Sequence, residues 1–161
     1  MTAEFSRVVQ VARVREGTHR AVDASTAECH AVAARLGLNA VHQLRCVFDL
    51  YPAEKGVVVA SGKLRARVDQ TCVVSLEAFE AEVTEDFRVR FVPAGTENDD
   101  IDLEADDEIP YEGTALDLGE AAVEQLALAL EPFPRKPGAE LPATAEDVGA
   151  FAALARLRGR H

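Results

Sequence analysis

The chain has 161 residues, of which 48% are hydrophobic and 28% are charged, and its formal net charge at pH 7 is −11. This balance is typical of a globular protein and predicts one domain over residues 1–161. A strongly acidic protein is repelled by nucleic acid at long range, so the composition argues against DNA as a partner and confines any RNA contact to a local basic surface.

Two further features of the composition bear on where the protein works. No stretch approaches the ~20 apolar residues of a membrane span, and arginines interrupt the short apolar runs of Met1–Arg15, where a signal peptide would be continuously apolar. The three cysteines, Cys29, Cys46 and Cys72, are widely spaced and odd in number, which favours reduced, buried thiols. We therefore expect a cytoplasmic protein without membrane contact.

The first predicted elements are a strand over Phe5–Val14 and a helix that follows it. Ser25 and Glu28 have capping-box spacing, in which a hydroxyl accepts a free amide at the start of a helix and a carboxylate reaches back. Glycine is favoured directly after the last helical turn. We therefore expect the helix to begin at Ser25 and to end at Gly37.

Three runs of alternating apolar and polar residues then predict an antiparallel meander. They cover residues 39–51, 58–76 and 79–93, with a turn over Pro52–Gly56 after the first. The second run carries a basic stripe on the face opposite its apolar residues, formed by Lys63, Arg65 and Arg67. In the third run Glu85 interrupts the apolar face, which predicts a bulge or a strand end there.

The acidic charge is concentrated in one part of the chain. Residues 77–131 hold 18 acidic and 2 basic side chains, and nine of the acidic ones lie between Glu97 and Glu112. Few large apolar residues accompany them, so burial cannot offset the entropy of ordering this stretch. We expect residues 94–113 to form a mobile acidic loop.

Two helices are predicted after the acidic loop. Asp117 offers a cap for the first, whose apolar residues recur every four positions from Leu118 to Leu130, with Glu120 and Glu124 facing water. Prolines end this helix and open a connector over 132–143. The connector contains Pro132, Pro134 and two basic residues, Arg135 and Lys136. A C-terminal amphipathic helix is expected over 144–158.

The predicted fold is therefore α+β, a meander packed by two or three helices, and the pattern leaves open whether the sheet stays open or curls toward a barrel.

The residues offer no catalytic centre of a familiar kind. No serine lies in a G-x-S-x-G setting, and neither phosphate-binding glycine motif occurs. The histidines and cysteines lack zinc spacing, and Tyr111 stands where an EF-hand loop beginning at Asp100 needs its glutamate. We predict no catalytic residue, no metal site and no cofactor.

An ordered set of weak motifs resembles one family. The motifs are Val68-Asp69-Gln70-Thr71-Cys72-Val73-Val74-Ser75-Leu76-Glu77, the strand 87–93, an acidic loop, Leu116-Asp117-Leu118-Gly119-Glu120, and Leu126-Ala127-Leu128-Ala129-Leu130-Glu131-Pro132-Phe133-Pro134. Together they resemble the YceD-like family of large ribosomal RNA subunit accumulation proteins. Many members carry C-x-R-C-L where this chain has Cys72, Val74 and Ser75, so a role that needs a thiol pair is in doubt here.

The resemblance implies a non-enzymatic factor in the synthesis, processing or stability of large-subunit ribosomal RNA. The hypothesis we favour is that Lys63, Arg65, Arg67, Arg135 and Lys136 contact precursor RNA phosphates or a ribosomal protein. Two alternatives remain: a metal-assisted phosphodiesterase that uses Asp99, Asp102 and Asp106, and an adaptor that binds only proteins.

Overall fold

The computed structural model describes residues 3–96 and 106–139. Its elements in chain order are β1 (Val8–Gln10), the short 3-10 helix η1 (Val11–Arg13), β2 (Thr18–Asp23), α1 (Thr26–Leu36), β3 (Ala40–Pro52), the 3-10 turn η2 (Glu54–Gly56), β4 (Val58–Thr71), β5 (Ala78–Pro93), β6 (Asp107–Tyr111), β7 (Ala115–Asp117) and α2 (Leu118–Ala129). The predicted α+β class is confirmed. The expected helix over 144–158 and the connector beyond residue 139 lie outside the described residues.

The main sheet has five strands in the order β2-β3-β4-β5-β6. The first four are antiparallel neighbours, as a meander requires, but β6 runs parallel to the end of β5. The sheet is open, with β2 at one edge and β6 at the other. The N-terminal strand β1 does not join it and pairs instead with β7 in a separate two-stranded ribbon.

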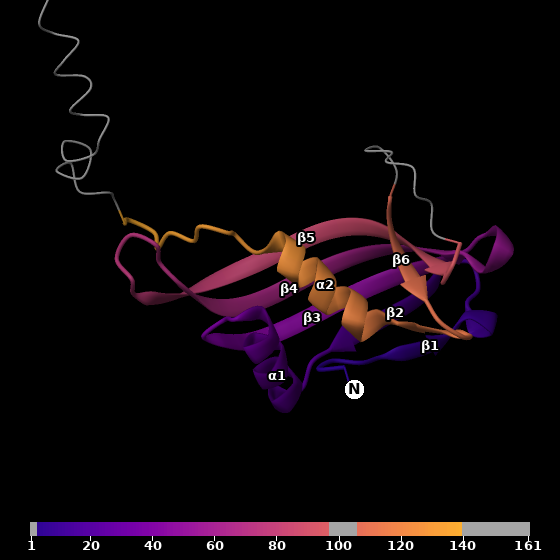
Figure 1. Ribbon diagram of the computed structural model, residues 1–161, viewed down its shortest axis with the longest axis horizontal. Helices are drawn as coiled ribbons and strands as arrows, with labels where there is room; N and C mark the ends of the chain where they lie inside the picture. The colour runs from indigo at the N-terminus through magenta and orange to yellow at the C-terminus, as the bar shows by residue number, and fades with distance from the viewer. Residues whose placement is uncertain (1–2, 97–105, 140–161) are drawn as a thin grey trace, which may run out of the picture.

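One face of the sheet carries the core. Figure 1 shows α1, α2 and the β1–β7 ribbon on the same side of the long, twisted strands β3, β4 and β5. Every second residue of β4 is buried on this side, while its neighbours are half-buried or exposed. The fully buried large side chains come from both layers and include Phe48, Leu50, Phe91, Leu118 and Leu126. No helix covers the opposite face within residues 3–96 and 106–139, and we call it the uncovered face; many of its side chains are charged.

The local predictions for α1 are confirmed. Ser25 and Glu28 form a reciprocal capping box at its start. Gly37 ends it in the left-handed region, with φ 67°, where glycine lacks the Cβ that would clash. The N-cap role of Asp117 in α2 is also confirmed.

Several strand boundaries differ from the prediction. The strand expected over 5–14 shortens to β1 and continues as η1, and β2 was not expected at all. Strand β4 ends at Thr71, because the chain then turns back toward β5 and brings Leu76 to φ 61° with 77% of its surface exposed. No bulge occurs at Glu85, which pairs in continuous register with Leu64.

Two other expectations need correction. Part of the segment expected to be a loop over 94–113 is strand β6, because its residues find backbone partners along Val89–Pro93 of β5. Residues 97–105 of that segment lie outside the described part. In α2 the buried surface is wider than a single stripe, so Glu120 and Glu124 are half-buried instead of facing water.

Candidate binding surfaces

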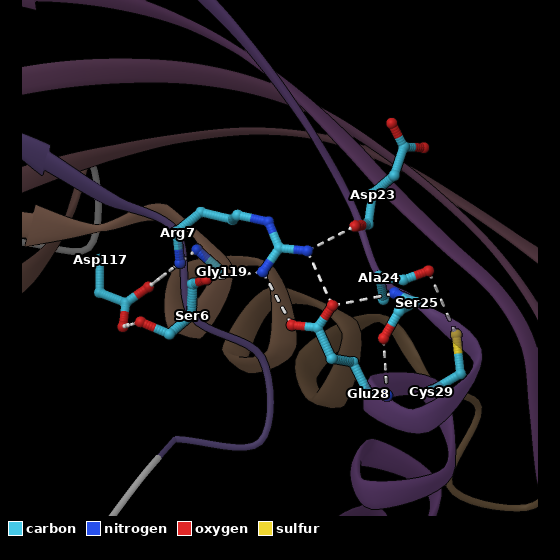
Figure 2. Close-up of polar contacts among 9 residues, drawn as sticks. All are labelled: Ser6, Arg7, Asp23, Ala24, Ser25, Glu28, Cys29, Asp117 and Gly119. Atoms are coloured by element: carbon cyan, nitrogen blue, oxygen red, sulfur yellow. Dashed lines mark hydrogen bonds and ion pairs between the residues drawn. The ribbon is translucent and has the colours of Figure 1, made fainter.

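Figure 2 shows the polar contacts that join the N-terminal segment to the two helices. The carboxylate of Asp117 accepts the backbone amides of Gly119 and Glu120 at 3.1 and 3.2 Å, which caps α2. It also accepts the hydroxyl of Ser6 at 2.6 Å and the backbone amide of Arg7 at 2.8 Å. Asp117 therefore fastens the N-terminal segment to the start of α2, and its contribution is structural.

The guanidinium of Arg7 extends this network to α1. It donates to both carboxylate oxygens of Glu28 at 2.7 Å and to the carbonyl of Asp23 at 2.9 Å. Glu28 also accepts the backbone amide of Ser25 at 3.0 Å within the capping box. The hydrogen bonds from Arg7, followed by those from Ser25, lower the pKa of Glu28 to about 2.

The other residues of the Leu118-Gly119-Glu120 motif also serve packing. Leu118 is fully buried. A Cβ at Gly119 would lie 2.5 Å from the backbone carbonyl oxygen of Phe5, so only glycine allows the two backbones to approach so closely. Glu120 accepts two hydrogen bonds from Arg35 of α1, at 2.9 and 2.7 Å. This motif thus holds the helices and the N-terminal segment together.

The basic stripe of β4 lies on the uncovered face beside acidic residues of β5. Arg65 contacts Glu82 at 3.5 Å, and Arg67 contacts Glu80 at 3.1 Å. All four side chains are at least half exposed. Lys63 makes no ion pair among the described residues. Spacing within β4 could predict the stripe, but the acidic neighbours depend on the β4–β5 register.

Other cations on the uncovered face are paired as well. Arg45 contacts Asp23 at 2.8 Å, and Arg88 contacts Asp106 at 3.0 Å. The uncovered face therefore alternates positive and negative charge across its strands and is not a continuous basic surface.

The two basic residues of the connector lie at different places, Lys136 at the β4–β5 turn and Arg135 beside residues 79–84 of β5. The Val73 amide donates to the Pro134 carbonyl at 2.9 Å, which ties the connector to this turn. Lys136 then contacts Glu77 at 2.9 Å, whereas Arg135 makes no ion pair within the described residues. The structure therefore brings Lys136 to the β4–β5 turn rather than to the basic stripe of β4. Pro132 precedes this contact in the same extended segment.

The thiol of Cys72 is buried in the β4–β5 turn. The backbone amide of Ser75 donates to its sulfur at 3.4 Å. Hydrogen bonds from the side chain and the backbone of Ser75 lower the pKa of Cys72 to about 6. Ser75 therefore occupies the position beside the sulfur, and the turn contains one thiol, not two.

One group of possible metal ligands occurs in the described part of the chain. Ligand atoms of His42, Asp69 and Glu80 lie within 4.8 Å of one another on the uncovered face. Arg67 already contacts Glu80 at this point, and its positive charge opposes a cation there. The carboxylates proposed for a phosphodiesterase are not brought together in this part: Asp106 pairs with Arg88, and Asp99 and Asp102 lie outside it.

A long strand edge was missed by sequence reasoning. Strand β6 pairs only with Val89–Pro93, so residues 78–88 of β5 have no strand beside them on the side away from β4 among the described residues. We call this stretch the free edge of β5. A groove of about 330 Å³ lies along it, between β5 and the end of α2 with the connector. The free edge exists because β6 is much shorter than its neighbour β5, and a single sequence does not show which strands will be neighbours.

A family model described as "Large ribosomal RNA subunit accumulation protein YceD" matches residues 60–157. No curated protein and no solved structure matches the chain. No helix within the described residues is both long enough and apolar enough to cross a membrane. Because the matched range covers more than half of the sequence, the chain belongs to the YceD family.

Proposed function

We propose that this protein acts in the accumulation of large-subunit ribosomal RNA as a non-enzymatic binding factor, and that the partner it binds is a protein of the large-subunit assembly pathway. Family membership supports the process. The observation that carries the choice of partner is the pairing of Arg65 and Arg67 with Glu82 and Glu80. Cations that already have carboxylate partners attract phosphate weakly.

The net charge of −11 points in the same direction. Ribosomal proteins that bind RNA present basic segments, and an acidic protein attracts such segments while it repels the RNA itself. Mixed charge on the uncovered face also suits a protein partner, since interfaces gain specificity from complementary potentials. Buried cysteines without disulfides fit a cytoplasmic site of action.

The experiment is a co-purification of the full chain from cells, read out for ribosomal proteins and for precursor RNA. We expect ribosomal proteins to be recovered after ribonuclease treatment, because the contact does not pass through RNA. Depletion of the protein should lower large-subunit RNA relative to small-subunit RNA. Recovery of neither component, with unchanged RNA levels on depletion, would contradict the proposal.

Direct RNA contact remains a second candidate because two cations are available for it. Lys63 and Arg135 make no ion pair in the part of the chain that the structure describes. Charge reversal at Lys63, K63E, should weaken RNA recovery if phosphates are contacted there. Under the protein-binding proposal the same variant leaves the recovered ribosomal proteins unchanged after ribonuclease treatment. The matched control is K55E, at an exposed lysine in η2.

A further inference from the structure

Within the described residues, the free edge of β5 presents backbone groups without a strand partner over eleven residues, from Ala78 to Arg88. In an antiparallel sheet, backbone amides and carbonyls alternate between the two sides of a strand, so those directed away from β4 lack a strand partner in the described structure. An exposed edge of this length is a template for another strand, and natural proteins usually cover or shorten it. This edge is therefore able to accept an additional strand.

The groove along the free edge has a mixed lining, in which the apolar part comes from β5. Phe79, Ala81 and Val83 line it and are half-buried on the side that faces the helices. The opposite wall comes from the end of α2 and the segment after it, where Glu131 and Arg135 bring one negative and one positive charge to the groove. An extended peptide that pairs with the edge would therefore place every second side chain over apolar surface, since strand side chains alternate between faces.

On the uncovered face, charge alternates from strand to strand toward the free edge. The β4 stripe is basic, and its neighbours on β5, including Glu80, Glu82 and Asp86, are acidic. The contacts of Arg65 with Glu82 and of Arg67 with Glu80 show the two columns meeting. Glu80 and Glu82 already have these cations as partners, whereas Asp86 makes no ion pair among the described residues. Asp86 is therefore the carboxylate most available to a basic residue on an added strand, because opposite charges on neighbouring strands stabilise pairing and like charges oppose it.

We propose that the free edge of β5 binds an extended basic segment of a partner protein by strand addition, with lysine or arginine at every second position and apolar residues between them. This inference rests on the proposed protein-binding function and names the site and the chemistry of the partner. Main-chain hydrogen bonds to the edge supply affinity, and the alternating surfaces supply specificity.

The same charges disfavour two other occupants. If the whole free edge paired antiparallel with that of a second copy, the centre would be Val83 and Glu80 would lie opposite Asp86, and like charges in that position are destabilising. RNA phosphates would meet the same acidic column and the exposed Glu85 and Glu131, which outnumber the one cation of the groove, Arg135. A basic protein segment is the occupant that the charges favour.

The test uses the full chain and a ten-residue synthetic peptide that alternates lysine with valine. Amide hydrogen exchange is followed by NMR with and without the peptide. We expect alternate amides of residues 78–88 to exchange rapidly in the free protein and at least tenfold more slowly with the peptide bound. A peptide of the same composition in scrambled order, and one that alternates glutamate with valine, should bind at least tenfold more weakly.

Variants of the protein test the charge argument. E85K with D86K changes two exposed residues that make no ion pair in the described part, and it should weaken the lysine peptide at least fivefold. The matched control, E16K with E54K, makes the same charge change at exposed positions away from the free edge of β5 and should leave binding unchanged. Equal binding by both variants would overturn the proposal.

Four other results would also overturn it. Slow exchange of the edge amides in the free monomer would mean that another part of the chain covers them. Protection that depends only on protein concentration would mean that a second copy binds there. The last two are protection by a ribosomal RNA oligonucleotide and peptide binding without protection of the edge. The co-purification separates this inference from the proposed function. If E85K with D86K recovers the same ribosomal proteins as the unaltered chain, the edge is not the site but the function stands, whereas recovery of none by the unaltered chain contradicts the function itself.

Discussion

The two faces of the main sheet differ in what their residues contribute. The covered face is apolar. The Asp117-Leu118-Gly119-Glu120 motif beside it joins α2 to the N-terminal segment and to α1 through the burial of Leu118, hydrogen bonds to Asp117 and the contact of Glu120 with Arg35. The uncovered face carries exposed ion pairs such as Arg65 with Glu82. The comparison teaches that this part of the family motif maintains the fold, and our proposal assigns recognition to exposed residues outside it. Substitutions on the covered side should therefore change stability most.

The largest effect is expected for Gly119→Ala. The added Cβ would lie 2.5 Å from the Phe5 carbonyl oxygen, which is backbone and cannot rotate away. We expect a loss of about 2–3 kcal/mol in the free energy of unfolding, measured by urea denaturation, as for other overpacked sites. The control is Ala127→Gly on the exposed side of α2, expected to cost about 1 kcal/mol through helix propensity alone. A smaller loss for Gly119→Ala than for the control would contradict the close approach.

The next largest effect is expected for Asp117→Ala. It removes the cap of α2 together with the acceptors of Ser6 and Arg7, so a loss of about 2 kcal/mol is expected in the same measurement. Asp117→Asn keeps one acceptor oxygen and should lose less. If the two variants were equally unstable, the carboxylate would not be acting as a helix cap.

Glu28→Gln should show a pH-dependent effect. The pKa of Glu28 is lowered to about 2 from 4.5 by Arg7 and Ser25, so its carboxylate stabilises the fold above pH 4.5 and loses that contribution as the pH falls toward 2. Near pH 7 the variant should be less stable by about 1–2 kcal/mol, a figure reduced for the partial exposure of the pair. Thermal melts at several pH values check this. The difference between the two proteins should shrink at acidic pH, and a constant difference from pH 7 to 3 would assign the effect to packing.

The smallest effect is expected on the uncovered face. Arg65→Ala and Glu82→Ala each remove one partner of an exposed pair and should cost no more than about 0.5 kcal/mol. The double variant, compared with the two single ones, gives the coupling between the side chains. A coupling well above 1 kcal/mol would mean that this face is also part of what holds the fold together.

Sequence reasoning succeeded where the signal is local. The capping box at Ser25 and Glu28, the glycine after α1 and the cap at Asp117 depend on neighbours within three residues, and each is confirmed. The alternation in β3 was equally readable, since every second residue of Leu44–Leu50 is buried.

It failed where partners are distant or where a pattern continues past its element. Only one residue of β2, Val22, is buried, so this strand has no alternation to detect. Strand β6 is acidic and owes its place to parallel pairing with β5. The apolar parity of β4 runs on to Leu76, although the turn begins after Thr71. The basic stripe was readable, but its carboxylate partners follow only from the register between β4 and β5.

Because the free edge of β5 is acidic, ionic strength should influence which molecule pairs with it. On the proposed mode of binding, repulsion keeps the edges of two copies apart, and attraction draws in a lysine-rich segment. Dissolved salt screens both forces over a length of about 10 Å at 0.1 M. High salt should therefore weaken binding of the basic segment. It should also weaken the repulsion that opposes edge-to-edge aggregation, so we expect binding to be most selective, and solubility highest, in dilute buffer.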